Sequence, residues 1–165
     1  MNNIVMLILM VLISLPASNV QAQTLKAPDG TCSATLSIES LGGFRVLQLP
    51  DNREIRDVNG TVWLDGSTLI YSVSPIYGET PGVFAYRCSD KKLVTIKVAK
   101  NKNSAYPRGA DYFEVLKIDG RQLIYFYYAA DVDSIDFRTF RTARNLYQMR
   151  VDGRGLSKAP NSRGK

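Results

Sequence analysis

Beyond its N-terminus the chain is built from short runs in which apolar and polar residues alternate or β-branched residues cluster. Gly, Asp, Asn and Pro separate these runs every 8–12 residues, and helix signals are nearly missing. This pattern predicts an all-β domain of antiparallel strands. The predicted strands are Ser33–Ile38, Arg45–Leu49, Thr61–Leu64, Thr68–Val73, Val83–Arg87, Lys92–Val98, Tyr112–Ile118, Gln122–Tyr128 and Asn145–Val151.

Asn59-Gly60 is a strong local signal for a tight hairpin. The dipeptide lies between two apolar runs, Ile55–Val58 and Thr61–Leu64. Two-residue hairpin turns need positive φ, which Asn and Gly adopt at little cost. The sequence therefore predicts a β-turn at 59–60.

The chain contains an internal repeat. Asp65–Tyr71 and Asp119–Tyr125 share Asp, Gly, Leu, Ile and Tyr at five of seven positions. A second unit, Val83–Leu93, aligns without gaps on Leu146–Leu156, and Arg45–Ile55 is a candidate third copy. A period of about 50 residues predicts a meander or a propeller-type architecture.

The repeated Asp-Gly-x-x-Leu-Ile-Tyr unit, followed by a strand and a polar turn, resembles the WD-like β-propeller repeats of periplasmic and secreted bacterial proteins. That resemblance covers 61–98 and 112–156 and implies blade-like sheets. Three copies fall short of the 4–8 blades that close a ring. Antiparallel meanders in a two-sheet sandwich are slightly favoured over a partial propeller-like stack, and a barrel or an α+β fold is the remaining alternative.

The N-terminus reads as an export signal. Ile4–Leu15 is apolar apart from Ser14, and it is shorter than the roughly 20 residues that span a bilayer. Pro16 follows, and Val20 and Ala22 are small residues at the positions that a signal peptidase reads. We expect cleavage after Ala22 and a periplasmic or secreted protein.

These boundaries predict three segments. Residues 1–22 form a signal peptide, residues 23–157 a single β domain, and residues 158–165 a disordered basic tail without apolar periodicity.

Cys32 and Cys88 are the only cysteines, and in an oxidising compartment we expect them to form a structural disulfide. Two free thiols are the alternative, and a redox role is disfavoured because no Cys-x-x-Cys motif occurs. The chain has no histidine. Triad catalysis and histidine-ligated zinc are therefore excluded, and we expect no metal, no cofactor and no enzyme activity. Hydrolysis through carboxylates stays open as a weaker alternative.

Charge is concentrated at the C-terminal end: residues 1–136 carry a net −1 and residues 137–165 a net +7. A basic surface outside the cytoplasm favours an acidic protein or an anionic envelope component as partner, is compatible with peripheral membrane contact, and disfavours nucleic acid. A solvated connection pinned by its aromatic residues is the alternative. The candidate contact residues are Arg138, Phe140, Arg141, Arg144, Tyr147 and Arg150.

Four consecutive aromatic residues occupy positions 125–128. Because side chains alternate along a strand, Tyr125 and Tyr127 must point away from Phe126 and Tyr128. One pair would form core, and the other pair would be either buried under a loop or exposed as a platform for sugar or protein.

Taken as a whole, the sequence favours an exported, non-enzymatic β domain that binds a macromolecule in the cell envelope, such as an inhibitor or immunity-type protein. A carbohydrate- or envelope-binding module is the alternative.

Overall fold

The computed structural model describes residues 21–39, 44–74, 80–99, 110–132 and 145–160. All regular structure within these ranges is β-strand, and every strand pairing is antiparallel. The predicted all-β class is therefore confirmed.

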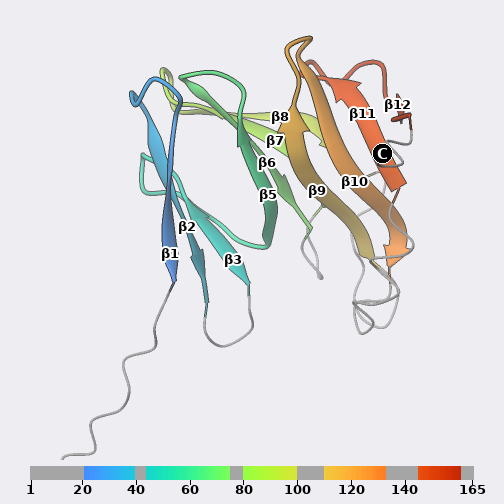
Figure 1. The fold of residues 1–165 in the computed structure, drawn as a ribbon. Coiled ribbons are helices and arrows are strands. Elements are labelled where there is room, and N and C mark those ends of the chain that lie inside the picture. Colours follow the sequence, from blue (N-terminus) through green and yellow to red (C-terminus); the bar gives the residue numbers. More distant parts are fainter. Residues whose placement is uncertain (1–20, 40–43, 75–79, 100–109, 133–144, 161–165) are drawn as a thin grey trace, which may run out of the picture.

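Twelve strands form three four-stranded sheets, each a meander of strands that are consecutive in the chain (Figure 1). The N-terminal sheet contains β1 (Ala22–Lys26), β2 (Ser33–Ile38), β3 (Arg45–Gln48) and β4 (Glu54–Ile55). The middle sheet contains β5 (Val58–Trp63), β6 (Thr68–Val73), β7 (Gly82–Arg87) and β8 (Lys92–Val98). The C-terminal sheet contains β9 (Ala110–Ile118), β10 (Leu123–Val132), β11 (Asn145–Arg150) and β12 (Ser157–Lys158).

The three sheets form three layers, and the middle sheet is covered on both faces. All six residues of β6 are buried. Leu69, Tyr71 and Val73 pack toward the N-terminal sheet, whereas Ile70 packs toward the C-terminal sheet. A strand buried on both faces reads as a continuous apolar run rather than as an alternation, and Thr68–Val73 has that character.

Two separate cores hold the three layers together. The core between the N-terminal and middle sheets is formed by Ala34, Leu47, Leu49, Val58, Leu69, Tyr71, Val73 and Tyr86. The core between the middle and C-terminal sheets is formed by Ile70, Val83, Ala85, Ala99, Phe113, Val115, Ile124, Phe126 and Met149. Each Val, Leu, Ile, Phe or Met side chain buried in this way contributes about 1.5–3 kcal/mol, before conformational entropy is subtracted.

Two serine side chains, one in β6 and one just after it, accept hydrogen bonds from backbone N–H groups on the free edge of β9. The Val115 N–H donates to Ser72 Oγ at 3.0 Å, and the Phe113 N–H donates to Ser74 Oγ at 2.8 Å. Ser72 is fully buried. These bonds join the middle and C-terminal sheets. They use N–H groups of β9 that do not pair with a neighbouring strand, and burying such groups without an acceptor would destabilise the fold.

We expect Ser72→Ala to destabilise the fold by about 1–3 kcal/mol, because the buried Val115 N–H would lose its acceptor. Denaturant unfolding measures the difference. Ser33→Ala on β2, where the side chain is exposed, is the matched control and should change stability by less than about 0.5 kcal/mol. Equal midpoints for the two variants would contradict the assigned role of Ser72.

The hairpin predicted at Asn59-Gly60 is wrong: both residues lie inside β5, at a register shift against β6. Gly60 is needed there because β9 approaches its backbone closely. A Cβ at this position would overlap the Val115 carbonyl oxygen and lie 2.8 Å from the Val115 nitrogen. The Asn59 side-chain amide donates to the Phe113 carbonyl at 3.3 Å.

Aspartates shape the hairpin turns. Asp29, Asp51, Asp65, Asp119 and Asp152 each accept a bond from the backbone N–H two residues ahead. This is the local bond by which Asp favours turns.

The Asp-Gly pairs do not all place their glycine at positive φ. Gly30 and Gly153 have φ of +73° and +80°. In the turn that begins at Asp119, the residue with positive φ is Gln122, at 58°, and not Gly120. At Gly66 a Cβ would overlap the Asp29 carboxylate, which is the end of a side chain and would have to move aside.

The repeated sequence units occupy equivalent places in their sheets. Asp65–Tyr71 and Asp119–Tyr125 each supply the turn before the second strand and the first residues of that strand. The three second units, which begin at Arg45, Val83 and Leu146, each supply a third strand and the turn after it.

Regular structure extends past both predicted domain limits. β1 starts at Ala22, the last residue of the expected signal peptide. β12 includes Lys158, and Ala159 is buried with its N–H bonded to the Leu146 carbonyl at 3.0 Å. The ordered domain therefore reaches beyond the expected boundary at 157.

The predicted disulfide is present: Cys32 and Cys88 are joined, with their Cα atoms 6.4 Å apart. Cys32 follows the turn between β1 and β2, and Cys88 begins the turn between β7 and β8. The bridge thus ties the N-terminal sheet to the middle sheet at the end where the hairpin turns gather, uppermost in Figure 1.

Candidate functional site

The outward side of the C-terminal sheet carries a grid of side chains from three strands, which we call the outer tyrosine face. Strand register places Tyr125 between Lys117 and Gln148, and Tyr127 between Glu114 and Leu146. Its members are Tyr112, Glu114, Lys117, Leu123, Tyr125, Tyr127, Leu146, Gln148 and Arg150.

Local contacts hold the rings of this face in place. The Lys117 ammonium lies 5.0 Å from the centre of the Tyr125 ring, a cation–π contact. The Tyr125 hydroxyl donates to the Asp119 carboxylate at 3.3 Å, and the Tyr112 hydroxyl donates to Glu114 at 3.3 Å. The rings are therefore preorganised while remaining half-exposed, which lowers the entropy that a partner must remove on binding.

The protonation states of the Tyr125–Asp119 pair are well separated. Partial desolvation raises the pKa of Tyr125, and the nearby Asp119 carboxylate raises it further. Backbone donation from Leu123, with further donation from Arg121, holds the pKa of Asp119 below its ordinary value. Tyr125 is thus a neutral donor and Asp119 a charged acceptor at neutral pH.

The predicted opposition of aromatic pairs is confirmed. Phe126 and Tyr128 face the core between the middle and C-terminal sheets, where Phe126 is 1% exposed. Phe113 packs on both, with ring centres 6.0 Å and 4.9 Å apart. Tyr125 and Tyr127 lie on the opposite side and are half-buried, so neither full burial nor full exposure describes them.

Tyr147 was expected to anchor a partner, and the structure places it elsewhere. Its ring stacks on Phe126 at 6.1 Å and meets Tyr128 edge-on at 5.8 Å, at the margin of the core. Register explains this position, because Tyr147 is paired with Phe126 and so shares its face. Tyr147 therefore packs at the margin of this core and not on the outer tyrosine face.

Arg150 keeps its predicted surface position. Its side chain is exposed, stands opposite Leu123 on the outer tyrosine face, and forms an ion pair with Asp152 at 3.5 Å. The other predicted contact residues, Arg138, Phe140, Arg141 and Arg144, lie outside the described residues.

Sequence reasoning missed the contribution of β9. Tyr112, Glu114 and Lys117 join the face because β9 pairs with β10 through two register shifts. The alternation of Tyr112 and Glu114 was a visible signal, but the irregular register that brings Lys117 beside Tyr125 was not.

The N-terminal sheet presents a different outward surface. Thr24, Thr35 and Gln48 lie side by side across β1, β2 and β3, with no aromatic residue among them. Short hydroxyl side chains of this kind are typical of a solvated sheet face rather than of an interface anchor.

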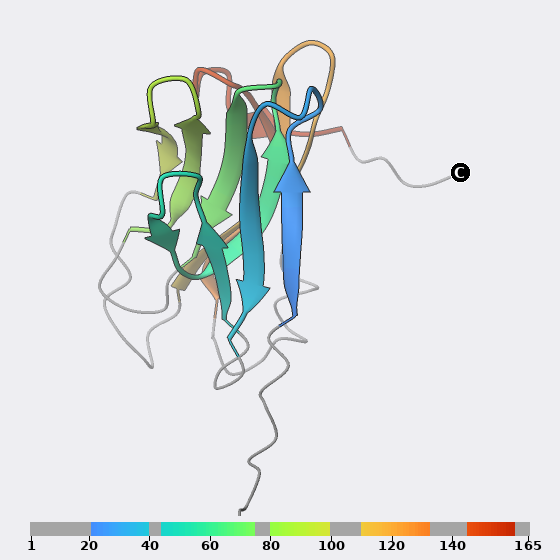
Figure 2. The same ribbon diagram turned by 90° about the vertical axis from the view of Figure 1, so that its left-hand side faces the viewer.

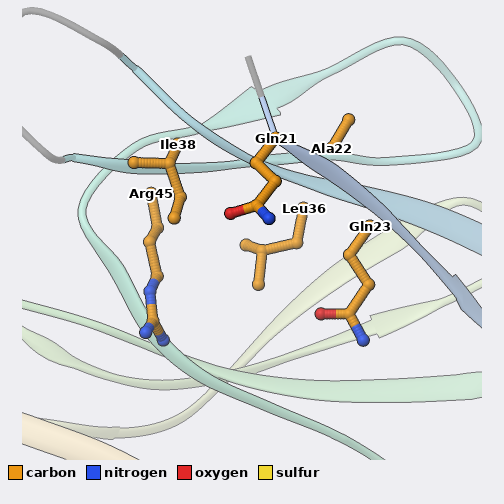
Figure 3. Close-up of a pocket in the computed structure, with 6 residues that line it drawn as sticks. All are labelled: Gln21, Ala22, Gln23, Leu36, Ile38 and Arg45. Atoms are coloured by element: carbon orange, nitrogen blue, oxygen red, sulfur yellow. The ribbon is translucent and has the colours of Figure 1, made fainter. Parts of the chain in front are cut away.

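A shallow hollow lies at the opposite end of the N-terminal sheet from the hairpin turns, with a volume of about 480 Å³. Figure 3 shows Leu36, Ile38 and Arg45 directed into it beside two glutamines. Gln21 and Ala22 form part of its lining, and the expected cleavage would remove both.

Among the described residues, no group of three or more Cys, Asp or Glu side chains is arranged to hold a metal ion. The same part of the chain has no helix of the length and hydropathy required to cross a bilayer. The chain matches no protein-family model, no curated protein and no solved structure.

Proposed function

We propose that this protein is an exported, non-enzymatic binding module that recognises an acidic protein of the cell envelope through the outer tyrosine face. The observation that carries the proposal is the grid itself. Tyr112, Tyr125 and Tyr127 lie together on one sheet face with Lys117 and Arg150. Tyr and Arg are the residues enriched at interface hot spots.

Charge supports an acidic partner. Lys117 and Arg150 are exposed on the face, and the chain from residue 137 onward carries a net +7. A positive surface raises the encounter rate with acidic proteins, and salt screens this effect over about 8 Å.

Two observations support a non-catalytic role. The chain has no histidine. Five aspartates, which would be the natural candidates for carboxylate chemistry, instead accept backbone N–H bonds within turns. The disulfide is compatible with an oxidising compartment outside the cytoplasm, which supports export to the periplasm or medium.

We also propose that the three sheets are blades of an incomplete propeller rather than a sandwich. The meanders follow one another in chain order, and the first strands lie close together. Gly60 of β5 meets Val115 of β9, and a hollow between β1 and β5 is lined by Leu25 and Trp63. An experimental structure that shows the third sheet folded back on the first would contradict this arrangement.

Photo-cross-linking tests the binding face. p-Benzoylphenylalanine replacing Tyr127 in the exported protein should give one cross-linked protein product, whereas the same group replacing Thr35 on the N-terminal sheet should give none. If both positions give the same products, or neither gives any, the face is not the site. Retention on peptidoglycan without a protein product would identify a glycan-binding module instead.

With the partner identified, we expect Tyr125→Ala combined with Tyr127→Ala to weaken binding by about 2–4 kcal/mol, a loss of roughly 30- to 1000-fold. Isothermal titration calorimetry measures it. The control is Thr35→Ala with Gln48→Ala, a cross-strand pair on the outward side of the N-terminal sheet, which should leave affinity unchanged. Both variants should melt near the parent protein.

A further inference from the structure

The outer strand of the middle sheet, β8, is an open edge. β7 pairs with it on one side, and no described strand pairs with it on the other. Figure 2 shows this strand at the far left of the molecule. Its seven residues, Lys92–Val98, make it a long edge, and an unpaired edge presents a row of backbone donors and acceptors to solvent.

Apolar side chains are concentrated on this edge. Leu93 is 37% exposed, Val94 36% and Val98 37%. They account for three of the seven large apolar residues that are exposed in the described chain. Because neighbouring residues on a strand point to opposite faces, Leu93 and Val94 leave both sides of the edge uncovered.

The other long edge is protected, and the contrast is informative. β9 has nine residues, and Ser72 and Ser74 satisfy its outward N–H groups at Val115 and Phe113. The remaining edges are shorter: β5 has six residues and lies against β9 at Gly60, β1 has five residues and is mostly polar, while β4 and β12 have two each. At β8, Gly153 in the turn between β11 and β12 lies against Ile96, beyond the Lys92–Thr95 stretch.

We propose that β8 is a docking edge that takes up an extended, acidic segment of a partner protein as a fifth strand of the middle sheet, paired to Lys92–Thr95. Strand addition supplies backbone hydrogen bonds, and the exposed Leu93 and Val94 supply side-chain contacts on the two faces. This site is separate from the outer tyrosine face and does not rest on it.

Charge identifies the occupant. Lys91, Lys92 and Lys97 flank the edge, and none has an ion pair with a described residue. The nearest acid, Asp90, is already paired with Arg87 at 2.6 Å. A second copy of β8 would bring like charges together, because antiparallel pairing about Thr95 places the lysines of both strands along one short ribbon. Lysines on an edge strand thus oppose self-association and favour an acidic segment.

A pair of synthetic peptides tests the site on the full protein. One alternates Glu with Val and Thr, and the other has Lys at every Glu position. We expect the acidic peptide to slow amide hydrogen exchange at Lys92–Thr95, and the basic peptide to leave it unchanged. The acidic peptide with alternate N-methylated residues should also fail, since it cannot complete the backbone ladder.

Charge reversal provides the matched comparison. Lys92→Glu with Lys97→Glu should weaken the acidic peptide at least about tenfold, whereas Lys26→Glu at the end of β1 should not. On the unchanged protein, raising salt should weaken the same interaction, so the proposal stays testable even if the double variant folds poorly. Protection at another strand, equal binding of the basic peptide, or peptide-independent protection that grows with protein concentration would each overturn it. The last result would identify a second copy as the occupant.

Discussion

Gly60→Ala should be among the most damaging single-methyl changes in the described chain, and we expect it to lower the free energy of unfolding by about 4 kcal/mol or more. The added Cβ would overlap the Val115 carbonyl oxygen and lie 2.8 Å from the Val115 nitrogen. Both are backbone atoms of β9, so no side chain can rotate away. Relief requires the middle and C-terminal sheets to separate, which would also stretch the Ser72–Val115 bond.

Gly120→Ala is the control for this change. It also adds one methyl to a glycine, but no atom lies within 4 Å of the new Cβ and the φ is ordinary. We expect it to be neutral or slightly stabilising, because alanine reduces the entropy of the unfolded chain. Chemical denaturation of both variants measures the difference. A Gly60→Ala protein within about 1 kcal/mol of the parent would show that the two sheets are not in close contact at this point.

Gly60 also shows why part of the fold could not be predicted. The local sequence Asn59-Gly60 has the composition of a tight turn, but the same dipeptide serves where a second sheet comes close. The decisive neighbour, Val115, is 55 residues away in the chain, and no local pattern reports it. Strand periodicity is a local property, so Ser33–Ile38, Thr68–Val73 and Lys92–Val98 were predicted with their observed bounds.

The number of layers could not be predicted, because alternation does not show whether a strand is buried on one face or on both. β6 and β10 carry the same Leu-Ile-Tyr sequence, yet β6 is buried on both faces and β10 on one. Their different surroundings come from sheet order: the middle sheet has neighbours on both sides, and the C-terminal sheet has a described neighbour on one. A strand's own residues show two faces without saying what covers each.

The sequence likewise predicted the candidate site only in part. Alternation placed Tyr125 and Tyr127 together, opposite Phe126. It could not place Tyr147, because that required the register between β10 and β11, which pairs Tyr147 with Phe126 and turns it toward the core. Register is a pairwise property of two strands, and a shift of one residue would have put Tyr147 on the outer tyrosine face instead.

Removing the disulfide should lower the free energy of unfolding by up to about 4 kcal/mol. Cys32 and Cys88 are 56 residues apart. In the chain-entropy model, opening a loop of that length raises the entropy of the unfolded chain and so stabilises the unfolded state by roughly this amount. Cys32→Ala combined with Cys88→Ala avoids leaving unpaired thiols. We expect a melting temperature lower by roughly 10–20 °C for a domain of this size. Reductant should lower the melting temperature of the parent in the same way and have no effect on the double variant.

The position of the bridge predicts where the loosening occurs. Other contacts also hold the N-terminal sheet to the middle sheet, besides the bridge and the core between them. The Thr31 hydroxyl donates to the Gly66 carbonyl at 2.9 Å, and Arg53 lies 5.6 Å from the centre of the Tyr86 ring. These contacts are exposed or few, so they cannot replace a covalent tie. Hydrogen exchange in the double variant should therefore accelerate more in β2 and β3 than in β9 and β10, whose core lies between the other two sheets. Uniform acceleration across all three sheets would mean that the domain opens as one unit and that the bridge stabilises the whole fold rather than the attachment of its first sheet.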